Sequence, residues 1–334
     1  MRNVYADCAA SAPVLPQLWD ILRDRELANP NATHFLGRKA RTTLEAAREC
    51  IAKCIGADKP SEIVFTPSAT EACRIAINVM NIGWCSPYEH KAVRDPVEFV
   101  RAYGVVDGDA AARMLVNNET GERYDFEIKK DTTHNRVFTD ATAAVGQIPI
   151  NVKDLGVEAL AAGAHKFGGI PGIGFLYMKG GISDDDTFPG TPPVALAVAM
   201  SEALLYRTEH MYEDTERMQA NLYRLGRDIM EIEGAHINTP IHAVRSILSV
   251  RFDGVNAREL LVALDALGVY ASAGAACSAD SDEPSRSLLA SGLTKEQALS
   301  TIRLSFCPET KPSDFQYVAE ALRKAVTQLR QLSV

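Results

Sequence analysis

The chain has 334 residues, of which 46% are hydrophobic, and its formal net charge at pH 7 is -8. A chain of this length exceeds what a single hydrophobic core usually supports, so we expect two unequal domains. The acidic balance argues against a nucleic-acid partner, because phosphate backbones require clustered Lys and Arg.

No secretory signal or apolar run of membrane-spanning length is present, which predicts a cytoplasmic protein with no membrane partner. The seven cysteines are odd in number and scattered, and this favours reduced thiols over a disulfide framework. Cys50 and Cys54 lie four residues apart without a second pair, so we interpret them as helix packing and expect no metal site.

The first half of the chain predicts a helix over residues 38–55, from apolar positions at helical spacing, and then a strand over 62–66. Ser68 and Glu71 have the spacing of a capping box, which predicts that a helix begins here. A helix N-terminus is either an ordinary cap or a site for a phosphate group, and both interpretations remain open at this point.

Two further strands, over residues 114–119 and 136–140, end in polar side chains. Because ligands bind at the carboxyl ends of strands in open α/β sheets, we expect Asn118 and Asp140 to converge on one crevice. A strand of small residues then leads to His165 and Lys166, and glycines follow. Such a lysine is either an ordinary surface residue or an amine held near the backbone, where an aldehyde cofactor would bind.

In the second half we predict strands over residues 174–178, 246–252, 269–273 and 301–306 and helices over 194–232 and 257–267. Met211 to Leu225 would cross between the domains. The last helix would begin at Ser313, where Ser313 and Gln316 again have capping-box spacing.

Together these segments resemble the group I cysteine desulfurases, which are pyridoxal 5'-phosphate (PLP) enzymes of the class V aminotransferase family. The resemblance extends over nearly the whole chain. The segments that carry it are Asp7-Cys-Ala-Ala-Ser-Ala-Pro13, Asn29-Pro-Asn-Ala-Thr-His34, Phe65-Thr-Pro-Ser-Ala-Thr-Glu71, Glu89-His90, Val116-Asn-Asn-Glu-Thr-Gly121, Asp140-Ala-Thr142, His165-Lys166, Gly190-Thr191-Pro192, Ala273-Gly-Ala-Ala-Cys277 and Ile302-Arg303-Leu-Ser305.

The resemblance implies the α/β fold of fold-type I PLP-dependent transferases: a large domain with a mostly parallel sheet flanked by helices, and a smaller α+β C-terminal domain. The large PLP-binding domain would comprise residues 12–210. Residues 1–11 and 211–334 would form the small domain, which carries the catalytic cysteine loop.

The resemblance also implies roles for individual residues. Lys166 would bind the PLP aldehyde covalently, and Asp140 would pair with the ring nitrogen so that the ring accepts electrons. His90 would stack on the ring and transfer protons. The remaining cofactor contacts would come from Asn118 at the ring oxygen, from Ala69, Thr70 and His165 at the phosphate, and from Thr191 of the partner subunit in a homodimer.

For the substrate, L-cysteine, the resemblance implies Arg303 as a bidentate clamp on the carboxylate, with Asn31 as a second contact. By position alone, a surface ion pair is the favoured interpretation of Arg303, whereas the match to the family motif favours the clamp. Cys277 would attack the substrate sulfur as a thiolate, which forms a persulfide and releases alanine. Its polar, small-residue surroundings favour an exposed thiol over a buried structural cysteine. A sulfur-acceptor protein of unspecified identity would then take the sulfur.

Three positions depart from the family pattern. Ala143 stands where the family usually has Gln, Gly163 where it has Ser, and Phe188-Pro189 where it has a basic residue. Each of these losses is expected to weaken cofactor binding by roughly 0.5–1.5 kcal/mol, or more where a partner is left unsatisfied. The chain also ends at Val334, before the tail with which relatives dock an iron–sulfur scaffold, so we do not expect delivery through such a tail.

Two other hypotheses remain beside the desulfurase. One is a selenocysteine lyase or another class V lyase or aminotransferase, in which turnover would survive Cys277→Ala. The other is a degenerate, PLP-poor subunit that binds or regulates an active desulfurase, which Ala143 and Gly163 motivate.

Overall fold

The computed structural model describes residues 2–23, 28–104, 106–125, 128, 133–182, 190–274 and 283–332. The chain divides into two compact units. Unit 1 comprises residues 1–11, 117–123 and 212–334, and unit 2 comprises residues 12–116 and 124–211. The sequence did not indicate that the short segment 117–123 belongs with the C-terminal unit.

Unit 2 is built on a six-stranded sheet in the order β2-β7-β6-β5-β4-β3. Its strands are β2 (Ile63–Thr66), β3 (Ile82–Cys85), β4 (Asp107–Ala112), β5 (Arg136–Asp140), β6 (Ala159–Gly163) and β7 (Gly174–Met178). Strands β3 to β6 are parallel to one another, and β7 runs antiparallel to both of its neighbours. The mostly parallel sheet expected from the sequence is confirmed.

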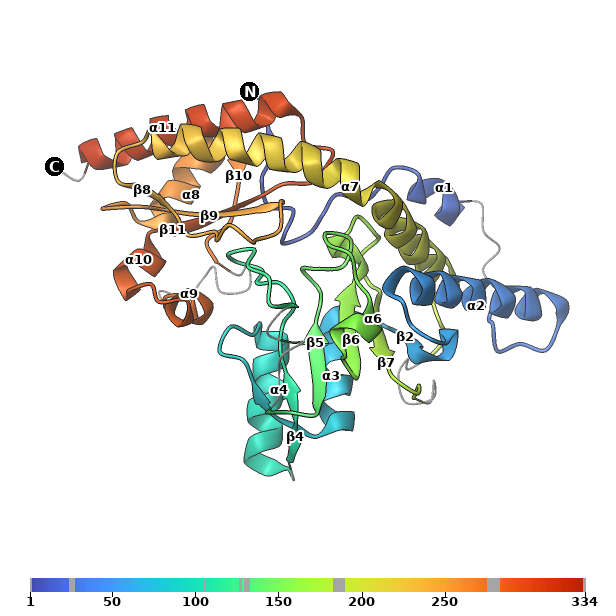
Figure 1. Cartoon of the computed structure of the whole chain (residues 1–334). Helices are drawn as coiled ribbons and strands as arrows, with labels where there is room; N and C mark the ends of the chain where they lie inside the picture. Colours follow the sequence, from blue (N-terminus) through green and yellow to red (C-terminus); the bar gives the residue numbers. More distant parts are fainter. Residues whose placement is uncertain are drawn as a thin grey trace. The chain divides into compact units, whose positions relative to one another are not determined.

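Helices pack on this sheet along their apolar faces. Figure 1 shows α3 and α4 beside the sheet; α3 packs mainly against β6 and β7 and α4 against the edge strand β3, and their apolar residues share a buried cluster with the strands. The helices of unit 2 are α1 (Leu18–Arg23), α2 (Phe35–Ile55), α3 (Ala69–Met80), α4 (Lys91–Tyr103), α6 (Val152–Leu155), the 3-10 turns Pro60–Glu62 and Ala164–Lys166, and the first part of α7 (Val194–Met230).

Unit 1 contains a three-stranded antiparallel sheet in the order β11-β9-β8 and a two-stranded parallel pair of β1 with β10. Its elements are β1 (Val4–Tyr5), β8 (Ala235–Ile237), β9 (Ile247–Phe252), α8 (Ala257–Ala266), β10 (Val269–Tyr270), α9 (Arg286–Ala290), α10 (Lys295–Leu299), β11 (Thr301–Ser305) and α11 (Pro312–Leu332). Figure 1 shows α11 lying alongside the C-terminal part of α7, and both helices contribute to one apolar core with β9 and β11.

Three predicted elements need correction. The strand expected over residues 114–119 instead lies at Asp107–Ala112, where three small alanines pair with β5 although the two aspartates and the glycine disfavour a strand. The region predicted as several helices over 194–232 is one helix. The last helix begins at Pro312, a favourable first position, so Ser313 is inside it and accepts a hydrogen bond from Arg2 instead.

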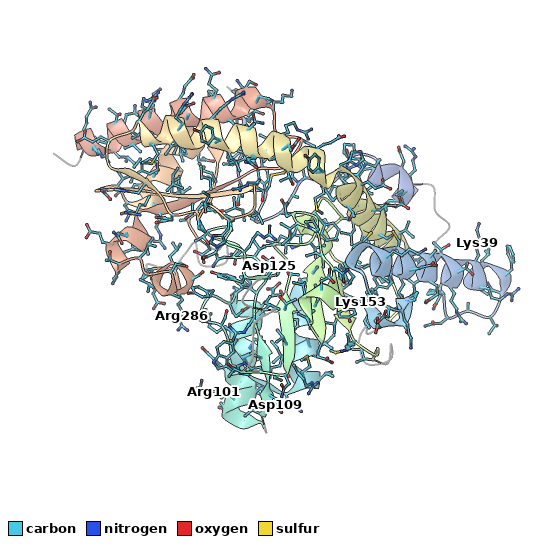
Figure 2. The ribbon with its side chains drawn as sticks, in the orientation of Figure 1. Lys39, Arg101, Asp109, Asp125, Lys153 and Arg286 are labelled. Carbon is cyan, nitrogen blue, oxygen red and sulfur yellow. A yellow bond between two sulfur atoms is a disulfide. The ribbon has the colours of Figure 1, made fainter. Side chains whose placement is uncertain are left out.

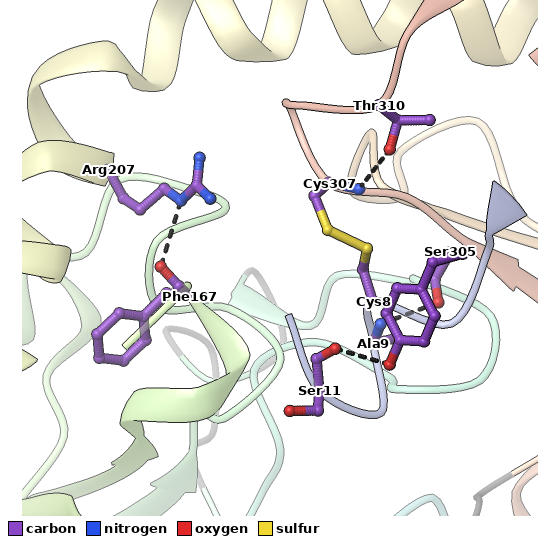
Figure 3. The surroundings of a disulfide bond; sticks show 9 residues. Cys8, Ala9, Ser11, Phe167, Arg207, Ser305, Cys307 and Thr310 are labelled. Atoms are coloured by element: carbon purple, nitrogen blue, oxygen red, sulfur yellow. Dashed lines mark hydrogen bonds between the residues drawn. A yellow bond between two sulfur atoms is a disulfide. The ribbon is translucent and has the colours of Figure 1, made fainter. Parts of the chain in front are cut away.

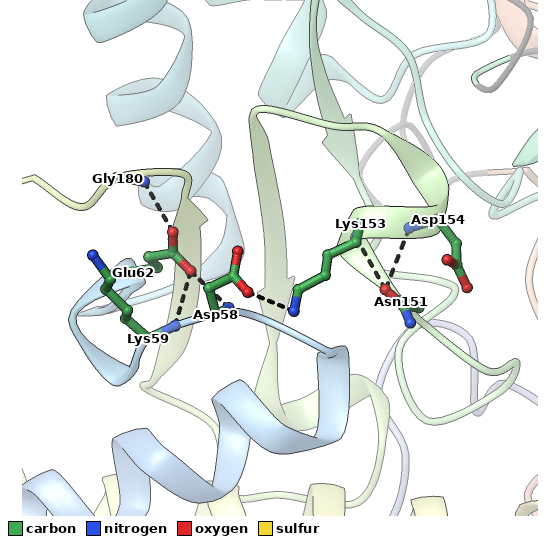
Figure 4. A network of polar contacts seen from close by, with 7 residues as sticks. All are labelled: Asp58, Lys59, Glu62, Asn151, Lys153, Asp154 and Gly180. Atoms are coloured by element: carbon green, nitrogen blue, oxygen red, sulfur yellow. Dashed lines mark hydrogen bonds and ion pairs between the residues drawn. The ribbon is translucent and has the colours of Figure 1, made fainter.

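A polar network fixes the loops at the β2 and β7 edge of unit 2 (Figure 4). The buried carboxylate of Glu62 accepts hydrogen bonds from the backbone N–H groups of Asp58 (2.9 Å), Lys59 (3.2 Å) and Gly180 (3.0 Å). At the exposed end of the network, Lys153 Nζ lies 2.5 Å from Asp58 Oδ1. Exposed ion pairs contribute little, so the backbone contacts of Glu62 hold this edge.

Charged side chains such as Lys39 on α2, Arg101 on α4 and Lys153 on α6 are exposed (Figure 2). The structure describes no helix that is both long and apolar enough to cross a membrane. Within the same described ranges, no three His, Cys, Asp or Glu side chains form a cluster suited to a metal ion.

Unit 1 contains a disulfide between Cys8 and Cys307 (Figure 3). The N-terminal arm lies against the end of β11, because Cys8 N donates to Ser305 O (3.1 Å) and Ala9 N donates to Ser305 Oγ (2.9 Å). The expectation of reduced thiols is therefore wrong for this pair. The two cysteines are 299 residues apart in sequence. The number and spacing of the cysteines along the chain do not indicate that the N-terminal arm meets β11.

This disulfide predicts a redox-dependent stability. A Cys8→Ser/Cys307→Ser variant should have a free energy of unfolding about 2–4 kcal/mol below that of the oxidised wild type, because the bond restricts the unfolded chain. Denaturant titration measures the difference. Reductant should lower the wild type to the level of the variant and leave the variant unchanged. A native protein whose two thiols are both alkylated without reductant would contradict the pairing.

Candidate active site

The N-terminus of α3 forms one side of the candidate site in unit 2. Ser68 is the N-cap, and its Oγ accepts a hydrogen bond from Glu71 N (3.2 Å). The Glu71 side chain instead binds Arg74 (2.9 Å), so only half of the predicted capping box forms. The N–H groups of Ala69 and Thr70 precede the first backbone bond of the helix, from Ala72 N to Ser68 O. A helix end of this kind attracts an anion.

Two glycines allow the sheet to approach this helix end closely. A Cβ atom on Gly174 would lie 2.8 Å from Ala69 N, a distance that no side chain tolerates. A Cβ atom on Gly163 would lie 3.2 Å from Ala69 Cβ and 3.4 Å from His165 Cδ2. The ends of β6 and β7, His165 and the start of α3 thus surround one small volume.

Asp140 is the last residue of β5 and is buried. Its Oδ1 accepts a hydrogen bond from Thr142 N (2.9 Å), and its carbonyl oxygen accepts one from Leu115 N (3.0 Å). Across the sheet it is paired with Ala161 of β6. The hydroxyl of Thr142 is buried and has no hydrogen-bond partner in the described part of the chain, so a bound ligand would satisfy it.

Lys166 ends the 3-10 turn that follows β6, and it is half-buried. The turn depends on the next glycines. Gly168 has a φ of +87°, and a Cβ on Gly169 would lie 2.9 Å from the carbonyl oxygen of Ala164. Arg207 Nε also donates to Phe167 O (3.2 Å), as Figure 3 shows. The backbone that carries Lys166 is therefore fixed on both sides.

His90 is the N-cap of α4, and its Nδ1 accepts a hydrogen bond from Ala92 N (3.1 Å). The neutral ring therefore carries its proton on Nε2. Burial lowers the pKa of His90, the charge of Lys166 acts in the same direction, and the charge of Asp140 opposes it. His90 thus lies within electrostatic reach of both Asp140 and Lys166.

His165 is also neutral at physiological pH, because burial, and to a smaller extent the charge of Lys166, lower its pKa to about 4. His165 lies near the start of α3, and Asp140 and Lys166 both act electrostatically on His90, so this part of unit 2 contains an amine, a carboxylate and two neutral imidazoles. These groups are suited to a covalently bound aldehyde with a ring nitrogen and an anionic group. Gly163 and Gly174 keep the strand ends close to the start of α3, and the buried Thr142 hydroxyl lacks a partner among the described residues; both features are compatible with such a ligand.

Arg303 and Asn118 belong to unit 1. Arg303 is 2% exposed; its Nη2 donates to Asp7 Oδ1 (2.7 Å) and its Nη1 to the carbonyl oxygen of Asn118 (2.8 Å). The alternative of a surface ion pair is wrong, since Arg303 is buried and Asp7 is only partly exposed. Nε is buried and lacks a hydrogen-bond partner in the described residues, which leaves a donor for an anionic ligand.

Sequence reasoning missed Asn117 and Glu119 in the same segment. Glu119 Oε1 accepts a hydrogen bond from Ser285 Oγ (2.8 Å), and Asn117 Nδ2 donates to Ser287 Oγ (2.8 Å). Burial raises the pKa of Glu119. These two hydrogen bonds hold the segment that contains Ser285 and Ser287. The run Asn117-Asn-Glu-Thr-Gly121 could have indicated both residues, but the resemblance implies a role only for Asn118.

The remaining predicted residues are less informative. Asn31 and Thr191 are exposed and lie in unit 2. Asn118 and Asp140 fall in different units, so their predicted convergence stays a prediction. Cys277 and the Phe188-Pro189 pair lie outside the described residues.

The family model for aminotransferase class-V matches residues 4–98, 108–185 and 183–318. The chain belongs to the class V aminotransferase family. Its relatives in this family include the cysteine desulfurase IscS of Dictyoglomus turgidum, 31% identical over 99% of this chain and 96% of that protein, and the IscS of Pectobacterium carotovorum subsp. carotovorum, 34% identical over 99% and 94%.

The solved structures that resemble the chain agree with this family. A NifS-like protein superposes with a TM-score of 0.87 at 25% identity, over 98% of this chain and all of that one. A protein named SspA, solved in complex with cysteine, superposes with a TM-score of 0.72 at 26% identity, over 92% of this chain. The expected fold-type I architecture and the family assignment are both confirmed.

Proposed function

We propose that the chain is a PLP-dependent cysteine desulfurase. It takes the sulfur atom of L-cysteine onto the Cys277 thiol as a persulfide and releases L-alanine, so that atoms and electrons balance without a further reactant. The observation that carries the proposal is that Asp140 and Lys166 both act electrostatically on the buried His90, in the unit where Gly163 and Gly174 bring the ends of β6 and β7 against the start of α3. The cysteine desulfurases that match nearly the full chain support the same activity.

PLP fits the residues of unit 2. When bound, it supplies a ring that accepts electrons from the substrate. Lys166 would hold its aldehyde carbon, and Asp140 would pair with its ring nitrogen. The residues of unit 2 proposed to complete the site are Ala69, Thr70 and His165 at the phosphate, His90 at the ring face and Thr142, whose buried hydroxyl has no other partner in the described chain. Asn118, which belongs to unit 1, is proposed at the ring oxygen.

The neutral state of His90 suits a proton-transfer role. Its Nδ1 accepts a hydrogen bond from Ala92 N–H and its Nε2 carries the proton, so Nε2–H acts as a donor and the ring receives a proton only at Nδ1. Since burial lowers its pKa, the ring does not hold a second proton at neutral pH. The amine of Lys166 supplies a second proton-carrying group close to the same histidine.

Arg303 is proposed to recognise the substrate carboxylate. Asp7 and the Asn118 carbonyl fix the plane of the guanidinium, and the unpartnered Nε is the donor left for a ligand. A fixed guanidinium loses little freedom when it binds a carboxylate. Asn31 is proposed as a second substrate contact.

We further propose a homodimer in which Thr191 contacts the cofactor phosphate of the partner subunit. The exposed position of Thr191 before α7 is compatible with this role. The acceptor of the sulfur would be a protein with a reactive thiol, since a persulfide passes sulfur to thiolates.

The activity is tested with Cys277→Ala. With L-cysteine and reductant, the wild type should release sulfide and alanine in equal amounts, whereas the variant should lose sulfide release by at least 100-fold, because no thiol attacks the sulfur atom. Cys85→Ala is the matched control and should retain activity. The absorbance of bound PLP should be the same in all three proteins.

Turnover that survives Cys277→Ala would contradict the desulfurase and favour the selenocysteine lyase or another class V reaction. A colourless protein that added PLP does not change would instead favour the binding or regulatory subunit.

Gly163→Ser tests the loss of a phosphate contact. The Cβ of the serine would lie beside Ala69 and His165. The serine hydroxyl should therefore reach an anion bound at the N-terminus of α3. We expect the Kd for PLP to fall about three- to tenfold, which corresponds to one added hydrogen bond of roughly 0.5–1.5 kcal/mol. Equilibrium titration of the apoprotein by absorbance measures it. Gly163→Ala adds the Cβ without the hydroxyl and should show no gain; an equal gain in both variants would contradict the explanation.

A further inference from the structure

Glu89 is a buried carboxyl group of unit 2 to which the mechanism above assigns no role. It precedes α4 and is 5% exposed. Its Oε1 accepts hydrogen bonds from Ser86 Oγ (2.7 Å) and from Met114 N (2.5 Å). Its Oε2 is buried without a hydrogen-bond partner among the described residues. Both donors therefore bind Oε1, and Oε2 is buried in the protein interior.

These hydrogen bonds connect the backbone next to His90 with the backbone segment that binds Asp140. Glu89 is followed directly by His90, the N-cap of α4. Met114 is followed directly by Leu115, whose N–H donates to the carbonyl oxygen of Asp140 (3.0 Å). The turn that contains Glu89 is also attached to the end of β4, because Ser86 N donates to Ala112 O (3.0 Å). A single carboxyl group thus links the start of α4 with the segment that holds Asp140.

The surroundings of Glu89 favour its neutral form. Burial raises the pKa of Glu89 to about 8; the negative charge of Asp140 on β5 adds to this, while the hydrogen bonds and Arg113 oppose it. The other titratable neighbours are Cys73 of α3 and Cys85 of β3, whose own pKa values are raised by burial, so both thiols are uncharged. Since Oε1 accepts two hydrogen bonds, the acidic proton belongs on Oε2.

We propose that Glu89 is a positioning residue of the cofactor site, acting as a neutral carboxylic acid that fixes the backbones of His90 and Asp140 and keeps a second negative charge away from Asp140. Its effect on the cofactor rests on the proposed function, whereas its effect on the folded protein does not. Ionisation of Glu89 would add a second buried negative charge within the electrostatic reach of Asp140, which is unfavourable.

The first test uses the apoprotein and needs no cofactor. Glu89→Gln keeps the accepting oxygen and replaces the O–H by an N–H. The wild-type pKa is raised from 4.5 in the unfolded chain, so the stability that Glu89 contributes is fully present below about pH 4.5 and is lost as the pH rises through about 8. The Tm of Glu89→Gln minus that of the wild type should therefore increase from pH 5 to pH 8 and then level off.

Glu98→Gln is the matched control, because Glu98 lies on the exposed side of the adjacent helix α4. Its Tm difference from the wild type should not show this rise. A flat difference for Glu89→Gln, equal to that of the control, would overturn the proposal that the residue is held neutral.

The second test uses the protein loaded with PLP. Absorbance of the bound cofactor should show a step near pH 8 in the wild type, where Glu89 ionises, and Glu89→Gln should lack that step. Glu89→Ala should weaken PLP binding about tenfold, because Met114 N–H and Ser86 lose their acceptor, while Glu89→Gln should bind as the wild type does. The same spectral step in both proteins would overturn the link to the cofactor. A wild type that binds no PLP would refute the proposed function and leave the apoprotein test valid.

Discussion

The pairing of β5 with β6 is the constraint on which the candidate site depends. It sets Asp140 opposite Ala161, so the carboxylate comes to the end of the parallel strands, and β6 then continues through Gly163 into the turn that carries Lys166. Because β7 returns at Gly174, which has no side chain, the start of α3 can lie against the same ends. A shift of one residue in this pairing would turn Asp140 to the other face of the sheet and separate the carboxylate from the amine.

Much of the fold could be predicted because the sequence carries local signals for it. The apolar runs of β2, β5 and β7, the helical spacing of α2 and the cap at Ser68 each depend on neighbouring residues, and the structure confirms them. The missed features depend on contacts between distant segments. The alanines of β4 form a strand only because β5 lies beside them, and Cys8 meets Cys307 only because the N-terminal arm lies against β11. Asn118 and Cys277 show a different limit: the first lies in another unit from Asp140, and the second lies outside the described residues.

Burial governs the electrostatics of the cofactor region. It lowers the pKa of His90 and of His165 and raises that of Glu89, so these three groups are neutral around pH 7. The charges that act on them include those of Lys166 and Asp140, the two groups a PLP site would use at its aldehyde and its ring nitrogen, besides those of Lys91, Arg94 and Arg113. The departures at Ala143 and Gly163 remove side-chain hydrogen bonds but do not change these charges. This arrangement supports the proposal that the site binds PLP over the alternative of a subunit that has lost the cofactor.

The central claim is that Lys166 holds PLP covalently beside Asp140. Borohydride reduction of the protein mixed with PLP, followed by digestion and mass spectrometry, tests it most directly, because reduction makes the attachment permanent. We predict one pyridoxyl group per chain, on the peptide that contains Lys166, and its absence after Lys166→Ala although other lysines remain. Label spread over several surface lysines, or unchanged labelling in the variant, would contradict the account.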